Sequence, residues 1–312
     1  MGLGPNVLAL YQQLKILGAL DHAKNVVELG SQDVWCNDPM LLVGLFRAFG
    51  RPVPSAEELG KYYNNNGTGQ VSSRRLHEQL GFNYTCVDID ARHDSITLDL
   101  NFDPVPAEHR GKYCLVTNHG TTEHILNQLN CFKVIHDLTR PGGLMMHGLP
   151  FTVHLEHGFF NYQPNFFTAL ARYNSYRTLG VWVAVDWTLK SFIPWEPRLL
   201  EFLKTDANTT HLLFVLQEKM YDSEFCAPIQ GVYEPMIPEE SLMRYQLVVD
   251  GEQYSGKRFS HLVRPSANRS GAWPAVIAQN VPTPAGLRSY SGWALLEELS
   301  WRVRRRLGVA GK

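Results

Sequence analysis

Carboxylate and small polar side chains close several apolar segments in the first 120 residues, where they could bind a nucleoside. Glu28 and Gly30 end the first of these segments, Asp88 ends the second, and Asp99 follows a few residues later. Residues 118–120, Asn-His-Gly, close a further segment. In an open parallel sheet, ligands bind beyond the carboxyl ends of the strands. Acids placed there accept hydrogen bonds from ribose hydroxyls, and glycine lets the backbone approach a ligand closely.

Histidine is the second residue type that suggests chemistry, because it is concentrated in and after the fourth and fifth apolar segments. These histidines are His119, His124, His147, His154 and His157. A histidine titrates near neutral pH, so it can remove a proton from a hydroxyl or an amine during a reaction. Each one taken alone also fits an ordinary core or surface position. We expect at least one of them to face the reacting group.

Alternating strands and helices must position these residues. Seven apolar segments are typical of buried strands: residues 25–29, 84–90, 96–100, 113–117, 144–149, 179–185 and 211–216. Apolar spacing and capping residues predict helices over 3–17, 40–49, 56 onward, 73–80, 121–138 and 164–173. This alternation predicts an α/β fold with a mostly parallel sheet and helices on both faces.

The chain divides into a core and two additions. We predict a core domain over residues 1–220 with a long insert at about 34–80, and a C-terminal extension over 221–312. The insert is either a lid over the binding site or surface decoration. The extension ends in an amphipathic helix near 296–307, which carries an arginine run. It could cap the sheet, shape a substrate pocket, bind a partner or form a homodimer contact.

The order of glycine turn, first acid, second acid and polar turn resembles the class I S-adenosylmethionine-dependent methyltransferases over roughly residues 20–220. The Arg-Pro-Gly-Gly turn at 140–143, between a helix and an apolar strand, is similar to another piece of that family. The resemblance implies a Rossmann-like sheet of seven strands in which the last strand is antiparallel. It also implies S-adenosylmethionine as cofactor and S-adenosylhomocysteine as product.

The first motif of the family carries an acid and a glycine, which Glu28 and Gly30 match. The family pattern then continues with further glycines, whereas this chain continues Ser31-Gln32-Asp33. The resemblance implies that Gly30 and Ser31 present backbone N–H groups to the methionine part of the cofactor.

The second and third acids complete the implied cofactor site. The resemblance implies that Asp88, with Ile89 beside it, binds the ribose hydroxyls, although Asp90 could take that role if the strand runs longer. Asp99 and Leu100 would meet the amino group and the ring face of adenine. Each acid alone could equally cap a turn.

The resemblance also implies where transfer occurs, because the polar turn after the fourth strand would line the sulfonium end of the cofactor. We therefore predict Asn118 as a cofactor-binding residue and His119, His124 and His157 as catalytic residues. The aromatic run at 159–167 could wall an apolar acceptor or pack a helix onto the sheet.

A divalent metal is a further cofactor to consider, although the sequence does not favour one. Some O-methyltransferases carry Glu-x-x-Glu-His at this position and bind a metal with it. Here Gly120 replaces the first glutamate, so only Glu123 and His124 remain. A later histidine (His147, His154 or His157) would have to complete the site, so we predict no metal ligands.

The composition of the chain limits the classes of partner that the protein is expected to bind. The formal net charge of −1 gives no electrostatic case for nucleic acid, and no apolar run reaches the length of a membrane span. The five cysteines lack metal-binding spacing and are expected to be buried thiols in a reducing cytoplasm. We predict a cytoplasmic methyltransferase that modifies a hydroxyl or amine of a small-to-medium molecule, such as a secondary metabolite or sugar. The alternative is a non-catalytic binding or assembly protein on the same scaffold, which the irregular turn after Gly30 favours.

Overall fold

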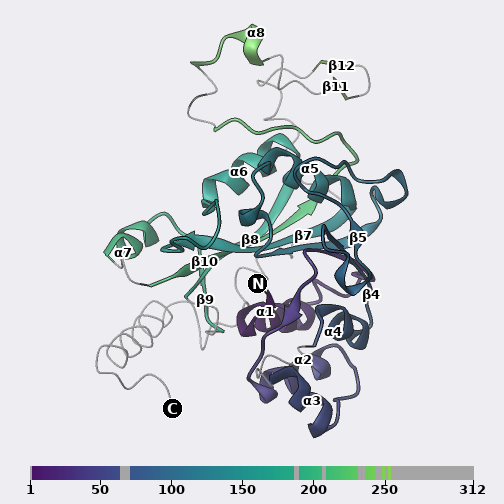
Figure 1. The fold of residues 1–312 in the computed structure, drawn as a ribbon. Coiled ribbons are helices and arrows are strands. Elements are labelled where there is room, and N and C mark those ends of the chain that lie inside the picture. Colours follow the sequence, from purple (N-terminus) through teal and green to yellow (C-terminus); the bar gives the residue numbers. More distant parts are fainter. Residues whose placement is uncertain are drawn as a thin grey trace.

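A mixed β-sheet forms the centre of the computed structural model (Figure 1). The structure describes residues 2–63, 71–185, 190–205, 209–230, 233, 236–242, 248–249 and 252–253. The described strands of the sheet are β2 (Asn25–Leu29), β4 (Asn83–Asp88), β5 (Ile96–Thr97), β6 (Tyr113–His119), β7 (Thr139–Thr152), β8 (Tyr176–Val185), β9 (Phe192–Pro194) and β10 (His211–Lys219). Two small pairs lie outside it, β1 (Gly2–Leu3) with β3 (Asp33–Val34) and β11 (Val248–Val249) with β12 (Glu252–Gln253).

The strand order in the sheet is β5-β4-β2-β6-β7-β10-β8-β9. The first five strands in this order run parallel to one another. Strand β10 is antiparallel to both of its neighbours, β7 and β8, so β8 runs in the direction of the parallel strands. The predicted α/β sheet with an antiparallel last strand is therefore confirmed. The sequence prediction missed β9, a short edge strand antiparallel to β8, which makes eight described strands rather than seven.

Helices cover both faces of the sheet, as Figure 1 shows. The helices of four or more residues are α1 (Pro5–Ile16), α2 (Pro39–Ala48), α3 (Ala56–Tyr63), α4 (Ser73–Leu80), α5 (Gln128–Leu138), α6 (Pro164–Tyr173), α7 (Leu199–Thr205) and α8 (Glu239–Leu242). Helices α1, α2, α3 and α4 share one apolar cluster with one face of the sheet, and α5 and α6 share a second cluster with the other face. Strands β6 and β10 are buried along their whole length, as strands covered on both faces should be.

Local capping rules explain the helices of the insert. Asp38 caps α2 by accepting a hydrogen bond from the Leu41 N–H at 3.0 Å. Ser72 caps α4, and that helix ends at Gly81 in the left-handed conformation with φ of 93°. These caps supply partners for backbone groups that a helix end leaves unpaired, so the predicted boundaries hold.

The predicted helix over residues 121–138 is wrong in its first third. A short 3₁₀ turn, η3 (Thr122–His124), precedes α5. The Thr122 N–H donates to Asn118 Oδ1 at 3.3 Å, and Asn127 caps the real helix by accepting from the Asn130 N–H at 3.1 Å. The later and better cap delays the helix by seven residues, which leaves the intervening residues free to build a loop.

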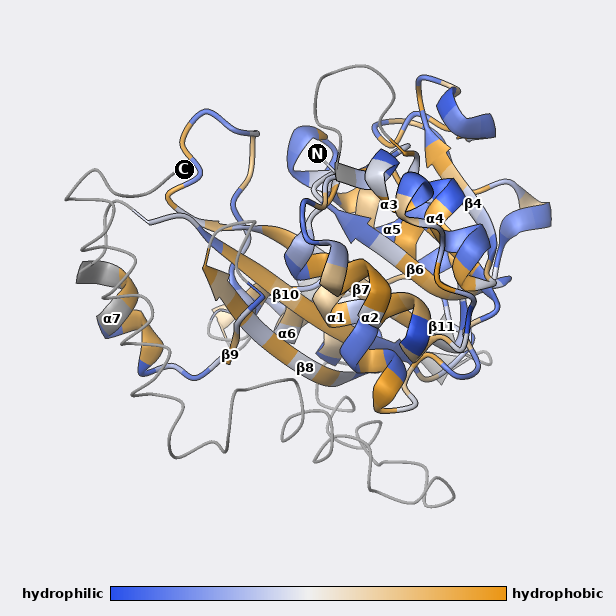
Figure 2. Ribbon diagram, turned by 90° about the horizontal axis from the view of Figure 1, so that it is seen from below, coloured by the Kyte–Doolittle hydropathy of each residue, from blue (hydrophilic) through white to orange (hydrophobic). Residues whose placement is uncertain are grey.

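Apolar strands run through the middle of the molecule, and polar colours lie toward the outside (Figure 2). Within the described residues, none of the helices has the length and apolar character required to cross a bilayer. The amphipathic helix predicted near 296–307 lies outside the described residues, and the boundary at 220 stays a prediction.

Phe214 tests the packing of this core, because its side chain is fully buried on β10 and its ring centroid lies 5.2 Å from that of Phe192. Phe214→Ala should lower the free energy of unfolding by about 3–5 kcal/mol through the cavity it leaves. Urea denaturation measures this change. Phe102→Ala, at a side chain that is 81% exposed, should change it by less than about 0.5 kcal/mol. Equal effects from the two substitutions would contradict the core described here.

Candidate active site at the carboxyl edge of the sheet

The strand order reverses between β2 and β6, so the two loops that follow these strands diverge. Such a reversal is the place where open α/β sheets bind ligands. Leu29 of β2 pairs with Asn118 of β6, and Gly30 follows with φ of 81°. The Gly30 N–H donates to the Val87 carbonyl at 2.8 Å, which ties the turn to β4. The predicted glycine turn therefore lies at the switch point, beside the end of β4.

Asp88 at the end of β4 faces this turn. Its Oδ2 accepts hydrogen bonds from the Ser31 N–H at 2.6 Å and the Ser31 hydroxyl at 2.8 Å. Its Oδ1 accepts from the backbone N–H groups of Ile89 at 2.7 Å and Asp90 at 3.4 Å. The structure thus brings the predicted residues Gly30, Ser31 and Asp88 together. The Ile89 side chain, by contrast, is exposed.

A loop that the sequence prediction did not single out holds the turn from outside. Arg92 Nε donates to Asp90 Oδ2 at 2.5 Å, and Arg92 Nη2 donates to the Ser31 carbonyl at 3.1 Å. The Ser31 hydroxyl also lies 3.0 Å from Asp90 Oδ1. Ala91 adopts a left-handed φ of 54°, which turns the chain back toward Ser31. The sequence gives no signal for this bend, because alanine rarely adopts it.

Glu28 lies behind the turn and is fully buried. Its Oε2 accepts hydrogen bonds from the hydroxyl groups of Ser73, on α4, and Tyr84, on β4. Burial raises the pKa of Glu28 to about 7, although the hydrogen bonds from Ser73, Tyr84 and the Gln32 backbone act in the opposite direction. Glu28 therefore supports the turn from the core and has no surface toward a ligand.

Asp99 and Leu100 occupy the turn after β5. Asp99 Oδ1 accepts from the Asn101 N–H at 2.8 Å, and the Asp99 carbonyl accepts from the backbone of Phe102 and Asp103. Leu100 is buried in the apolar cluster below α5. The half-buried Asp99 thus caps a turn, and its hydrogen bonds stay within residues 99–103.

Asn118 anchors the loop after β6. Its Nδ2 donates to the Thr122 hydroxyl at 2.9 Å and lies 3.3 Å from His147 Nδ1. The Tyr162 hydroxyl is the donor in this network. Its oxygen lies 2.9 Å from Thr122 Oγ1 and 2.6 Å from Gln128 Oε1. This buried network fixes η3, and it explains why the chain does not continue directly into α5.

His119 lies apart from the other predicted catalytic residues. Its side chain is fully buried, and its ring packs edge-on against Tyr11 of α1 with centroids 6.2 Å apart. Burial lowers its pKa to about 3. Because strand residues alternate between the two faces, the last residue of β6 points into the core below α1. This placement argues against a direct role for His119 in proton transfer.

Glu123, His124 and His157 form one group, which we call the Glu123 cluster. Glu123 Oε1 lies 3.9 Å from His124 Nε2 and 3.7 Å from His157 Nε2. The Glu123 side chain is fully buried, and neither of its oxygens has a hydrogen-bond partner within the described residues. Both imidazoles are partly exposed, at 43% and 31% of their side-chain surface. Desolvation raises the pKa of Glu123 to about 8 and lowers that of both histidines.

The loop after β7 brings His157 to Glu123. The Phe159 N–H donates to the Glu123 carbonyl at 2.7 Å. A Cβ on Gly158 would lie 2.9 Å from that carbonyl oxygen and 3.0 Å from Glu123 Cγ, so glycine is needed for the approach. Val153 and Glu156 both have positive φ, at 58° and 55°, which is a strained conformation for these residues.

The directions of the strands decide the fold. From β5 to β8, the sheet has seven strands of which only β10 is antiparallel, as the resemblance implied. This is the class I methyltransferase fold. No family model and no curated protein matches the chain.

Solved methyltransferase structures are similar to this chain at low identity. A putative sarcosine dimethylglycine methyltransferase from Galdieria sulphuraria is 13% identical over 68% of this chain and 84% of its own, with a TM-score of 0.40. A 1,6-didemethyltoxoflavin-N1-methyltransferase from Burkholderia thailandensis is 12% identical over 68% and 79%, with a TM-score of 0.34. A 16S rRNA adenine methyltransferase from Catenulisporales acidiphilia is 9% identical over 71% and 94%, with a TM-score of 0.35. The strand order, rather than these distant likenesses, defines the fold.

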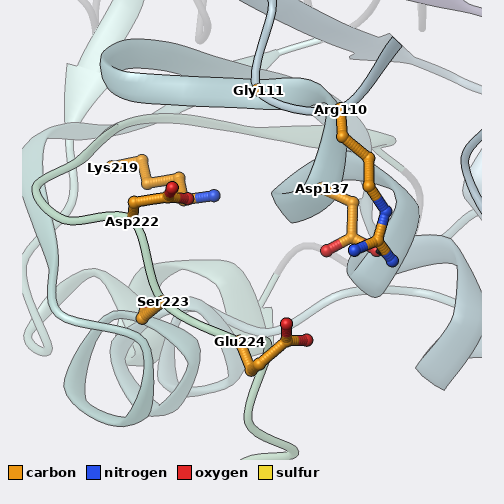
Figure 3. A pocket seen from close by; sticks show the side chains of 7 residues that line it. All are labelled: Arg110, Gly111, Asp137, Lys219, Asp222, Ser223 and Glu224. Atoms are coloured by element: carbon orange, nitrogen blue, oxygen red, sulfur yellow. Dashed lines mark hydrogen bonds and ion pairs between the residues drawn. The ribbon is translucent and has the colours of Figure 1, made fainter. Parts of the chain in front are cut away.

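A charged cavity of about 310 Å³ lies at the opposite edge of the sheet (Figure 3). Arg110 donates to Asp137 Oδ2 at 3.2 Å, and Lys133 donates to the same oxygen at 2.5 Å. The buried Lys219 donates to the His136 carbonyl at 3.0 Å. Three charged groups that line the cavity, Arg110, Asp137 and Lys219, are thus hydrogen-bonded within the protein. No predicted site residue lines the cavity.

Glu28 should make stability depend on pH. Its pKa in the folded protein is about 7, above the ordinary value of 4.5, so the folded state holds the proton more tightly. The free energy of unfolding should therefore fall by roughly 3 kcal/mol from this group as pH rises from 4.5 through 7. Urea denaturation across this range should show a flatter profile for Glu28→Gln. The exposed substitution Glu108→Gln should keep the wild-type profile, and a wild-type slope in Glu28→Gln would refute the assignment.

Proposed function

We propose that this protein is an S-adenosylmethionine-dependent methyltransferase that modifies a hydroxyl or an amine of a small-to-medium molecule. One observation carries the proposal: the Gly30 turn, Asp88 and the Glu123 cluster lie along one edge of a sheet with the class I strand order. The cofactor would supply an electrophilic methyl group. The protein would bind the cofactor, orient the acceptor and take up a proton.

Asp88 is the residue that would hold the ribose. A carboxylate offers about four acceptor positions, and Asp88 already accepts four hydrogen bonds. The Ser31 hydroxyl accounts for one of them, and it also lies within reach of both carboxylate oxygens of Asp90. A hydroxyl has a single hydrogen, so Ser31 can donate to Asp90 and leave Asp88 Oδ2 to a ribose hydroxyl. The residues present therefore fit the cofactor after one small rotation.

His124 and His157 are the candidate general bases. Their pKa values lie below the ordinary value of 6.5 because burial disfavours the imidazolium, so both rings are neutral at neutral pH, which is the form that can accept a proton. An imidazolium formed on either ring would lie within 4 Å of Glu123 Oε1, so it would favour ionisation of this carboxyl group and be stabilised by the resulting charge. We therefore assign proton uptake to these two histidines and the stabilising role to Glu123.

The surroundings of the Glu123 cluster support an acceptor with apolar surface. Leu126, Leu155 and Phe159 each lie two residues from a histidine of the cluster, and each is largely exposed. Exposed apolar side chains beside a polar site are typical of ligand contacts. A secondary metabolite fits this surface better than an unsubstituted sugar. Three statements about partners and location stay predictions: that the protein does not bind nucleic acid, that it could form a homodimer, and that it is cytoplasmic.

A non-catalytic scaffold is the second candidate, and the Gly30 turn favours it. A Cβ on Gly30 would lie 2.6 Å from both Gln32 Nε2 and Thr121 Oγ1, so side chains of the protein itself fill the space beside this glycine. Thr121 also donates to the Leu29 carbonyl at 2.7 Å, which links the loops after β2 and β6. A scaffold that has lost its cofactor could keep these contacts permanently.

Calorimetry with S-adenosylhomocysteine distinguishes the two candidates. The wild-type chain should bind it, and Asp88→Ala should weaken binding by about 1–3 kcal/mol through the lost hydrogen bonds to ribose. The control Glu108→Ala, at an exposed acid far along the chain from the turn, should bind as the wild type does. No binding at millimolar ligand by folded wild-type protein would support the scaffold instead.

Turnover separates the bases from the cofactor site. With an acceptor identified from a panel of hydroxyl and amine compounds, His124→Ala or His157→Ala should lower kcat by about 10²–10⁴-fold. Affinity for S-adenosylhomocysteine should stay within twofold of the wild type (roughly 0.4 kcal/mol). The exposed His22→Ala serves as the matched control and should leave both quantities unchanged. Full activity in both cluster variants would exclude these histidines as bases.

A further inference from the structure

The Glu123 cluster has the composition and spacing of a metal site. One ligand atom from each of Glu123, His124 and His157 lies within 4.8 Å of the other two. Ligands about 2.1 Å from a tetrahedral metal ion lie about 3.4 Å apart, so the three groups need to move by less than about 1 Å to bind an ion. The two histidines come from different loops, after β6 and after β7, which meet only in the folded chain.

The buried carboxylate is the observation that points to a ligand. Glu123 is fully buried, yet neither oxygen has a hydrogen-bond partner within the described residues. A buried polar group without a partner costs free energy, and such groups are usually paired or coordinate metals. Glu28 shows the ordinary solution in the same protein, because Ser73 and Tyr84 both donate to it. Among the described residues no such donor reaches Glu123, and its Oε1 faces the Nε2 atoms of two imidazoles instead.

From these contacts we infer that Glu123, His124 and His157 bind a divalent first-row transition-metal ion such as Zn²⁺. Imidazole nitrogens combined with one carboxylate suit such ions, whereas Mg²⁺ and Ca²⁺ prefer sites made of oxygen ligands. Three protein ligands leave at least one coordination position open, which is the arrangement of catalytic rather than structural zinc sites.

The open position gives the ion a role that rests on the proposed function. The partial exposure of both histidines leaves the cluster accessible from the carboxyl edge. An acceptor hydroxyl bound there would have its pKa lowered by the ion, which eases loss of its proton. With the ion bound, this role replaces the base role proposed above for the two histidines: they would act as ligands, and solvent would take up the proton. Binding of the ion itself does not depend on methyl transfer.

Metal titration of the full chain tests the inference. Protein stripped with a chelator should bind Co²⁺ in a one-to-one complex with visible absorption bands, and added Zn²⁺ should displace it and remove the bands. Removing an outer-shell partner of a metal site typically costs 10–100-fold in affinity, so loss of a direct ligand in His124→Ala or His157→Ala should weaken binding by at least roughly 100-fold. Because His124 is near the surface, its substitution should not prevent folding, which circular dichroism would verify.

The controls separate this inference from the proposed function. His22→Ala should bind Co²⁺ as the wild type does, and each variant should bind S-adenosylhomocysteine as the wild type does. Absence of Co²⁺ and Zn²⁺ binding, with intact S-adenosylhomocysteine binding, would overturn the metal site and leave the methyltransferase assignment standing. Unchanged metal affinity in both His124→Ala and His157→Ala would overturn it as well. Metal binding without any S-adenosylhomocysteine binding would support the site and contradict the proposed function.

Discussion

The reversal of strand order between β2 and β6 is the constraint on which the rest of the structure depends. Because β4 lies on one side of β2 and β7 lies on the far side of β6, the loops after β2 and β6 lead to different faces. Their backbone groups leave the sheet ladder at this point and need new partners. Thr121 supplies one by donating to the Leu29 carbonyl. Polar side chains lie at this edge of the sheet because they supply hydrogen-bond partners to backbone groups that have left the ladder.

Two buried glutamates show how one fold uses the same side chain in different ways. Glu28 has hydroxyl donors from α4 and β4, so it serves as a polar link between the insert and the first strand. Glu123 has no hydrogen-bond donor in the described chain and has two imidazoles beside it. Burial raises the pKa of both carboxyl groups, but only Glu123 lies beside groups that are open to solvent. The difference between the structural role of Glu28 and the role proposed for Glu123 therefore lies in their neighbours.

Features that depend on local rules were predictable from the sequence. The apolar strands and the helix over 73–80 each depend on a few adjacent residues, and the structure has them close to the predicted bounds. The helix expected from Thr121 was wrong because Thr122 bonds to Asn118 and Tyr162, and Tyr162 lies 40 residues further along the chain. No local sequence pattern reveals a hydrogen-bond partner so far along the chain. Tertiary contacts therefore determined where the helix begins.

The sequence predicted the residue types of the candidate site, but it did not predict which individual residues come together there. His119 is the last residue of β6 rather than part of the turn after it, and strand alternation directs its side chain into the core against Tyr11. His157 reaches Glu123 only because Gly158 permits close packing and Val153 bends the loop in a left-handed conformation.

The assembly of the site from separate loops has a consequence for its chemistry. The Gly30 turn and Asp88 belong to β2 and β4, whereas the Glu123 cluster belongs to the loops after β6 and β7. The Asn118 network fixes the second group from within the core through Thr122, Tyr162 and Gln128. Substitutions in the cluster therefore leave the hydrogen bonds around Asp88 in place. In the proposed function, binding of a cofactor and chemistry on an acceptor would therefore depend on two sets of contacts that can vary independently.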